Sequence, residues 1–163
     1  MIMVRTHAKS PGFSFLELLA SLAILALLAS LAMPLAQTTV KRDKERELRR
    51  ALRELRQGID AYKAATLDGR ISVPIEASGY PPDLNALVSG LPDARRSGSA
   101  RLYFLRRLPR DPFNADITVA AADTWGLRSF DSSQEAPKKG DDVFDVYSQS
   151  EQVGMNGVPY KQW

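Results

Sequence analysis

A single carboxylate stands inside the longest apolar stretch of this chain. Between Phe13 and Val40 the only charged side chain is that of Glu17. A carboxylate at the centre of a membrane-embedded helix costs at least about 2.5–3.5 kcal/mol, and less near the interface. Glu17 therefore either lies close enough to water to avoid this cost, or it has a cationic partner.

The peptide bond after Gly12 offers such a partner. Gly12 stands on the polar side of the apolar stretch, directly before Phe13. Cleavage after Gly12 would create an amino group on Phe13, four residues before Glu17. This amine could pair with Glu17 of the same chain or of a neighbouring copy, and in a low dielectric the pair would fix the register between packed helices.

Cleavage by an ordinary signal peptidase is the competing interpretation of the same segment. Such signals carry small residues after their apolar core, and Ser30-Leu-Ala32 would fit that site. The apolar stretch of this chain exceeds the 7–15 residues usual for a signal core. The position of Gly12 and the length of the stretch therefore favour cleavage after Gly12.

Enzymatic chemistry has few candidate residues here. The only histidine, His7, lies before Gly12, so no Ser-His-Asp arrangement is available once that leader is removed. The chain has no cysteine and no phosphate-binding glycine loop. The sequence predicts that the protein is not an enzyme and that it has no resident cofactor.

Calcium binding is a minor alternative to the prediction that the protein has no cofactor. The loop of residues 148–157 contains Glu151 as its only acid, whereas calcium requires several oxygen ligands. Asp141, Asp142 and Asp145 precede this loop, but strand alternation tends to send Asp142 and Asp145 to opposite faces. We therefore expect turn and surface roles for these aspartates.

The elements that position Gly12 and Glu17 follow from the apolar pattern. Residues 13–36 are mostly Leu and Ala, and a helix of these 24 residues is about 36 Å long, enough to cross a bilayer core of about 30 Å. Pro34 removes one backbone hydrogen bond, so we expect a helix kink there. The sequence predicts a leader over residues 1–12 and a transmembrane helix half over residues 13–40.

The helix is predicted to continue beyond the membrane as an amphipathic segment, residues 41–69. Its apolar residues recur at helical spacing, with alanines widening the stripe, and the charge run of residues 41–56 is expected to be solvated. Asp68-Gly69 forms a natural stop, so we expect one helix over residues 13–67. The stripe consists of Leu48, Leu52, Leu55, Ile59 and Tyr62 with Ala51, Ala61 and Ala65; the solvated face opposite consists of Arg46, Arg49, Arg50, Arg53 and Glu54.

Residues 70–163 are predicted to form a small α+β domain that covers this stripe. Turn residues punctuate short segments throughout. We expect a short helix over residues 83–88 with Asp83 as its N-cap, a loop over 90–98, and a rigid turn over 108–113. Strands are predicted at residues 117–120, 125–130 and 143–147, in a small antiparallel sheet packed on the long helix.

The N-terminal segment resembles a known family. Gly12-Phe-Ser-Phe-Leu-Glu-Leu-Leu19 is similar to the cleavage and methylation motif of type IV pilins and type II secretion pseudopilins. The resemblance implies that a prepilin peptidase cuts after Gly12 and methylates the new N-terminus at Phe13. It also implies that Glu17 is the acidic assembly residue and that Pro34 is the helix-kinking proline of these families.

The C-terminal region resembles the G-type major pseudopilin of type II secretion systems. Leu108-Pro-Arg-Asp-Pro-Phe113 is similar to a turn of that group, and residues 142–148 are similar to its late strand. The group binds calcium in the following loop with closely spaced aspartates, which this loop lacks. The resemblance implies a pilin-like filament whose partners are other copies, minor pseudopilins, the peptidase, the inner-membrane assembly platform and membrane lipid.

The charge distribution bears on topology and on partners. The net charge of +3 falls to +1 without the leader, because Arg5 and Lys9 lie within it. The basic residues after the span outnumber those before it, which by itself favours a cytoplasmic C-terminus. The family resemblance implies the reverse: a single-pass protein of the bacterial inner membrane with its C-terminal domain in the periplasm.

These observations give a principal function and two alternatives. The sequence predicts a structural subunit of a type II secretion pseudopilus that drives protein export across the outer membrane. The close alternative is a type IV pilin for adhesion, twitching or DNA uptake, and the distant one is an anchored periplasmic binding domain. The stretch Arg95–Arg110 combines arginines with Tyr103 and Phe104, as single-strand binders do, but the near-neutral charge of the processed chain argues against nucleic acid.

Overall fold

The computed structural model describes residues 12–96 and 98–163, except for the side chains of residues 31–36. The chain divides into two compact units, Met1–Lys41 and Arg42–Trp163. One helix, α1 (Phe15–Leu67), contributes its first part to the former unit and its last part to the latter. The predicted long helix is thus present, beginning two residues later than expected.

The first part of α1 consists mainly of Leu and Ala, which are good helix formers. Within the described residues, no helical segment is both long and apolar enough to cross a membrane. The predicted span of residues 13–40 therefore stays a prediction. The kink expected at Pro34 also stays a prediction; α1 continues through this position.

The C-terminus of α1 is closed by a glycine, as predicted. Gly69 has a φ of 65°, a conformation that a residue with a Cβ adopts only with strain. The amide of Gly69 donates to the carbonyl of Thr66 at 2.9 Å, and the amide of Arg70 donates to that of Ala65 at 2.9 Å. These two bonds form a Schellman motif, which satisfies carbonyls that the last helical turn leaves free.

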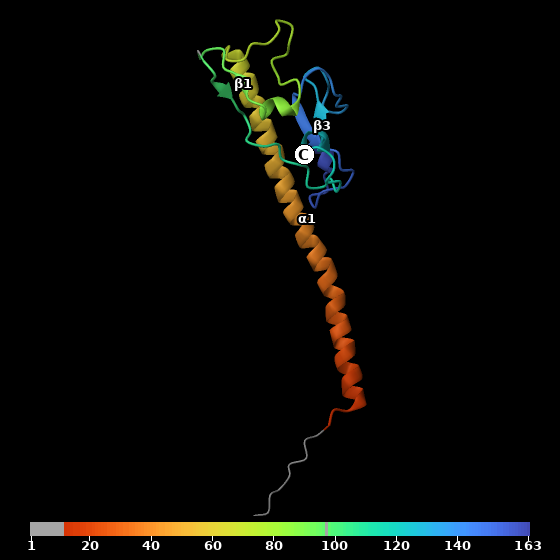
Figure 1. Cartoon of the computed structure of the whole chain (residues 1–163). Coiled ribbons are helices and arrows are strands. Elements are labelled where there is room, and N and C mark those ends of the chain that lie inside the picture. Colours follow the sequence, from red (N-terminus) through yellow and green to blue (C-terminus); the bar gives the residue numbers. More distant parts are fainter. Residues whose placement is uncertain (1–11, 97) are drawn as a thin grey trace, which may run out of the picture. The chain divides into compact units, whose positions relative to one another are not determined.

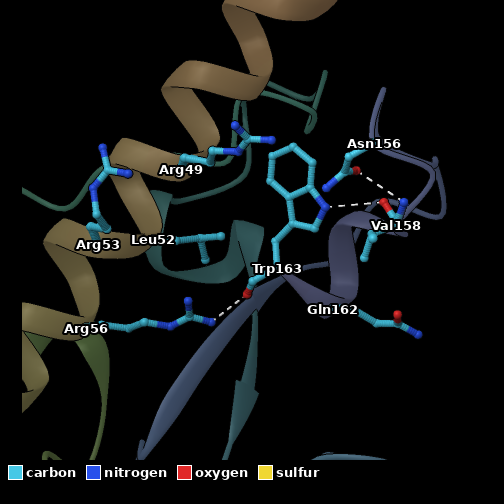
Figure 2. A pocket seen from close by; sticks show the side chains of 8 residues that line it. All are labelled: Arg49, Leu52, Arg53, Arg56, Asn156, Val158, Gln162 and Trp163. Carbon is cyan, nitrogen blue, oxygen red and sulfur yellow. Dashed lines mark hydrogen bonds between the residues drawn. The ribbon is translucent and has the colours of Figure 1, made fainter.

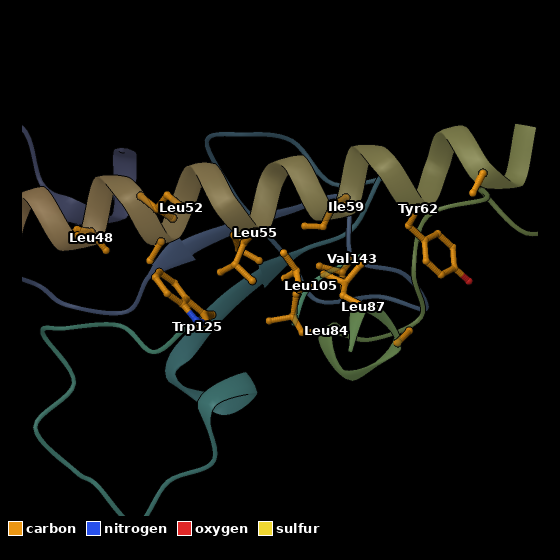
Figure 3. Close-up of a cluster of buried hydrophobic side chains, with 14 of the residues drawn as sticks. Leu48, Leu52, Leu55, Ile59, Tyr62, Leu84, Leu87, Leu105, Trp125 and Val143 are labelled. Carbon is orange, nitrogen blue, oxygen red and sulfur yellow. The ribbon is translucent and has the colours of Figure 1, made fainter. Parts of the chain in front are cut away.

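The core of the unit Arg42–Trp163 forms on one face of α1 (Figure 3). All five large residues of the predicted stripe are buried: Leu48, Leu52, Leu55, Ile59 and Tyr62. Ala51 and Ala65 are buried too, but Ala61 is exposed, so its assignment to the stripe was wrong. Gly58 takes part instead, and the Leu105 side chain packs within 3.0 Å of where its Cβ would lie.

The chain after α1 lies along this helix face as short segments (Figure 1). Two antiparallel strand pairs form: β1 (Leu91–Pro92) with β2 (Arg101–Leu102), and β3 (Trp125–Arg128) with β4 (Asp145–Ser148). In the second pair Trp125 is opposite Ser148 and Arg128 is opposite Asp145. Three 3-10 helices complete the described elements: η1 (Leu84–Leu87), η2 (Ala121–Thr124) and η3 (Tyr160–Gln162).

The α+β class with a long N-terminal helix and small antiparallel sheets is confirmed. The N-cap at Asp83 is also confirmed, because its carboxylate accepts a hydrogen bond from the Ala86 amide at 2.9 Å. The helix that follows is a single 3-10 turn. The predicted strand over 125–130 is present as β3, which ends at Arg128 because the Phe130 amide donates to the Asp142 side chain instead. The strand predicted at 143–147 begins two residues later, and β1 occupies part of the expected loop 90–98.

The strand predicted over residues 117–120 was wrong, because local polar groups hold this segment in turns. The Asp116 carboxylate accepts from the amide of Thr118 at 2.9 Å and from its hydroxyl at 2.6 Å. The Arg110 guanidinium donates to the carbonyls of Asp116 and Val119. These bonds give the backbone an alternative to a strand ladder, and Ile117 stays exposed.

Candidate processing and assembly site

The peptide bond between Gly12 and Phe13 lies in a non-helical, exposed segment. Residues 12–14 precede α1, and Phe13 is 79% exposed. The first helical bond in this region runs from the Leu18 amide to the Ser14 carbonyl at 3.1 Å. A peptidase must bind its substrate in an extended form, so an exposed bond just outside a helix is suited to cleavage.

Glu17 lies in the first turn of α1, and its side chain is exposed. A carboxylate at this end of a helix interacts favourably with the unsatisfied amides of the first turn. In the described part of the chain, no side chain forms an ion pair with Glu17. Its negative charge is therefore available to a partner outside these residues, such as another chain.

The two serines described in this helical segment are satisfied within it. The Ser21 hydroxyl donates to the Leu18 carbonyl at 2.9 Å, and the Ser30 hydroxyl donates to the Leu27 carbonyl at 2.7 Å. Serine can thus be placed in an apolar environment without an unsatisfied donor. Glu17 differs from these serines because a carboxylate has no donor with which to make such a bond.

The surface around Glu17 is apolar. Nine large apolar side chains of α1 between residues 15 and 28 are at least 49% exposed. A continuous apolar surface of this kind needs a cover, which lipid chains or neighbouring helices provide. The exposed side chains are Phe15, Leu16, Leu18, Leu19, Leu22, Ile24, Leu25, Leu27 and Leu28, of which Leu19 is the least exposed.

The structure places Gly12, Phe13 and Glu17 on one short segment at the start of α1. Glu17 lies four residues after Phe13, where cleavage after Gly12 would create the predicted amino group. The assigned roles of these residues stay predictions. Pro34 lies 17 residues after Glu17 on the same helix.

A second set of charged residues, which sequence reasoning missed, connects α1 to the C-terminal loops. Glu45 is 6% exposed, and its carboxylate accepts from the Met155 amide at 2.7 Å and from the Tyr160 hydroxyl at 2.9 Å. Burial and the adjacent Glu45 carboxylate raise the pKa of Tyr160 well above its ordinary value. Glu45 was assigned to a solvated charge run, and its spacing from Leu48 and Leu52 was the signal for burial.

Arg56 makes a comparable connection on the neighbouring side of α1 (Figure 2). Its guanidinium donates to Asp145 at 2.8 Å and to the Val146 carbonyl at 3.3 Å. It also donates to the Trp163 carbonyl at 2.7 Å, the bond that Figure 2 shows. Asp145 also accepts from Arg128 at 3.3 Å. Two arginines therefore share one carboxylate, and β4 and the C-terminal segment are both held against the helix.

The turn over residues 108–113 is held by a buried carboxylate. Asp111, 2% exposed, accepts from the Ser148 hydroxyl at 2.5 Å and from the Phe113 amide at 2.8 Å. The Asp111 amide donates to the Thr124 hydroxyl at 3.1 Å. Every bond of this network is internal to the domain, so Asp111 stabilises the packing of the turn against β4.

The acidic residues considered as calcium ligands either form other hydrogen bonds and ion pairs or are exposed without such bonds to any described residue. Asp142 accepts from the Phe130 amide, Asp145 pairs with two arginines, and Glu151 is exposed. Among the residues that the structure describes, no three acidic or histidine side chains are grouped closely enough to hold a metal ion. Asp142 lies in a bend, as expected of a turn residue, but the surface role expected for Asp145 was wrong, because Asp145 is in β4 and its carboxylate joins Arg56 to Arg128.

The stretch Arg95–Arg110 does not form one surface with its aromatic residues. Tyr103 is 62% exposed, but Phe104 is half-buried and packs on Tyr62 with ring centroids 5.4 Å apart. Arg110 is bound to backbone carbonyls. Phe104 is thus part of the packing around the core, whereas the neighbouring Tyr103 is exposed.

Comparison with known proteins gives one match. Residues 8–33 match the family model of the prokaryotic N-terminal methylation motif. No curated protein and no solved structure matches the chain. The matched residues include Gly12, Phe13 and Glu17, and the motif supports a type IV pilin-like family of structural, filament-forming subunits.

Proposed function

We propose that this protein is a subunit of a type II secretion pseudopilus, made as a precursor and cleaved after Gly12. The methylation motif over residues 8–33 supports a filament-forming subunit, and the bond after Gly12 within it is exposed and lies just before α1. The choice of a secretion pseudopilus rests on the resemblance of residues 108–113 and 142–148 to the G-type major pseudopilin. A prepilin peptidase would remove residues 1–12 and methylate the amino group of Phe13. The apolar part of α1 would then anchor the subunit in the inner membrane, with residues 42–163 in the periplasm.

The proposed mechanism uses the charge of Glu17 during assembly. An unpaired carboxylate on an apolar helix is costly in lipid, and that cost falls when a cation pairs with it. The amino group of Phe13 on a neighbouring subunit would supply that cation. Pairing would set the axial position of each new helix, while the apolar surfaces pack side by side and the assembly platform adds further subunits.

Processing is tested by the intact mass of the membrane-extracted protein. We expect a mature chain that starts at Phe13 and carries one added methyl group. Gly12→Val should leave the precursor uncleaved, because a branched side chain at that position would not fit a site built for glycine. A mature start at Met33 or Gln37 would instead indicate an ordinary signal peptide and overturn the proposal.

A type IV pilin is the second candidate, because the methylation motif is common to both classes in the family resemblance. Deleting the gene for this protein distinguishes the two functions. Failure of protein export without loss of surface fibres supports the pseudopilus, and loss of long surface filaments with normal export supports the pilus.

A further inference from the structure

A basic groove lies beside α1 within the unit Arg42–Trp163 (Figure 2). It has a volume of about 420 Å³ and is lined on the helix side by Arg49, Arg53 and Arg56. These positions are four and three residues apart, so they follow one flank of the helix. The C-terminal segment forms the opposite wall, where the centroid of the Trp163 ring lies 4.4 Å from the Arg49 guanidinium.

The groove carries positive charge that the described residues do not neutralise. Arg56 is paired with Asp145, but Arg128 shares that carboxylate. Arg49 and Arg53 form no ion pair with any described residue. Both are exposed, so their guanidinium groups can bind carboxylates of a partner.

The opposite flank of the same helix carries carboxylates. Glu47 and Glu54 are seven residues apart, which is two turns, so they lie on one side of α1. They line a separate hollow with Arg50, Arg107 and Arg110, yet neither glutamate forms an ion pair with any residue in the described part of the chain. The buried stripe of Leu48, Leu52 and Leu55 separates this flank from the groove on the side that faces the core.

We propose that the groove of one copy binds the Glu47–Glu54 flank of a neighbouring copy. The inference rests on the proposed filament and names the contact between its periplasmic domains. Both charged sets lie on the same turns of α1, so copies packed side by side with a small axial offset bring carboxylates level with arginines. Because the two surfaces differ, the contact is heterologous, and a heterologous contact that does not close produces an open helical filament.

The test reverses the charges of one surface in one version of the protein and those of the other surface in a second version. Both versions are full-length chains, produced in cells that process the precursor. Arg49→Glu with Arg53→Glu places carboxylates in the groove opposite those of Glu47 and Glu54, and Glu47→Arg with Glu54→Arg places guanidinium groups on the flank opposite those of Arg49 and Arg53. Each doubly substituted version should assemble poorly alone, because like charges then meet at every contact. Together they should assemble, since each groove then meets a flank of opposite charge.

Crosslinking reports the contact directly, because the chain has no native cysteine. One version carries Gln162→Cys in the groove, and the other carries Ala61→Cys, an exposed position seven residues after Glu54. A bismaleimide should join the two versions when their charged residues are otherwise unchanged. Charge reversal on one side alone should lower the yield about tenfold, and reversal on both sides should restore it.

Arg101→Glu with Arg106→Glu provides the matched control. Both arginines are exposed and lie outside the groove, so the same change in net charge should leave crosslinking unaltered. Normal crosslinking in the version with Arg49→Glu and Arg53→Glu would overturn this inference but not the proposed function. So would filaments in which the two introduced cysteines are not joined. A parent chain that forms no filament and no crosslink would overturn the proposed function as well.

Discussion

Glu17 and Glu45 are glutamates of the same helix in opposite circumstances. Glu45 is buried, and its carboxylate accepts two hydrogen bonds from the C-terminal loops. Glu17 is exposed in the first turn and has no ion-pair partner among the described residues. Glu45 therefore stabilises the fold of its own chain, whereas Glu17 is suited to an interaction with another.

We expect Glu17→Leu to leave cleavage and membrane insertion intact, because leucine is at least as favourable in lipid as a carboxylate. Filament assembly and export should fall sharply, because the Phe13 amino group loses its partner. Glu17→Asp should be partly impaired, since it keeps the charge but has a shorter reach. Crosslinking between subunits and export of a reporter substrate measure these effects. Normal assembly of Glu17→Leu would exclude Glu17 as the assembly residue.

Tyr160→Phe should lower the free energy of unfolding by about 1–3 kcal/mol, because it removes a hydrogen bond to the buried Glu45 carboxylate. Tyr103→Phe is the matched control, since Tyr103 is 62% exposed and should change stability by less than about 0.5 kcal/mol. Denaturant titration of a fragment that starts at Lys41 measures both. Equal midpoints for the two variants would show that the Tyr160 hydroxyl contributes nothing.

The same hydroxyl should make stability depend on pH. Its pKa is raised in the folded state, above an ordinary value of 10.0, so the folded protein retains a proton that the unfolded chain loses. This contribution is complete below pH 10 and declines as the pH rises above it. Burial also raises the pKa of Tyr62, so Tyr160→Phe should reduce the slope of stability against pH in that range without abolishing it.

At the scale of elements, the last part of α1 supplies one wall of the core. Leu55 is fully buried there, in the same cluster as Trp125, Val143 and Leu87. Leu67, the last residue of the helix, is 75% exposed. The two leucines share one helix and one chemistry, so a comparison between them isolates the effect of burial.

Leu55→Ala should lower the free energy of unfolding by about 2–5 kcal/mol, because it leaves a cavity in the core. Leu67→Ala should lower it by less than about 0.5 kcal/mol. Denaturant midpoints of the fragment from Lys41 onward provide the measurement. If Leu55→Ala and Leu67→Ala had the same midpoint, the stripe would not be the core of this domain.

At the scale of the whole molecule, the two units have different sources of stability. The unit Arg42–Trp163 contains the complete buried cluster and all the described strands, so it has what a domain needs to fold in water. The described apolar residues of the first part of α1 are exposed instead. In the proposed filament, lipid and the helices of other copies would cover them, which would connect the fold of one copy to the assembly of many.

The sequence by itself determined the features that depend on local order. Spacing of apolar residues predicted the helix and its buried stripe, Gly69 predicted its end, and Asp83 predicted an N-cap; each depends on residues within a few positions. The methylation motif is also a contiguous pattern. Such features need no knowledge of how distant segments meet.

Tertiary structure alone decided the features that depend on distant partners. Glu45 is buried because Met155 and Tyr160, more than a hundred residues later, offer it donors. Gly58 replaces Ala61 in the packed face because Leu105 packs against it, and Asp145 is shared by arginines from α1 and β3. Whether a charged residue is solvated or buried depends on the donors and acceptors that the fold brings to it, and spacing along one helix cannot supply that information.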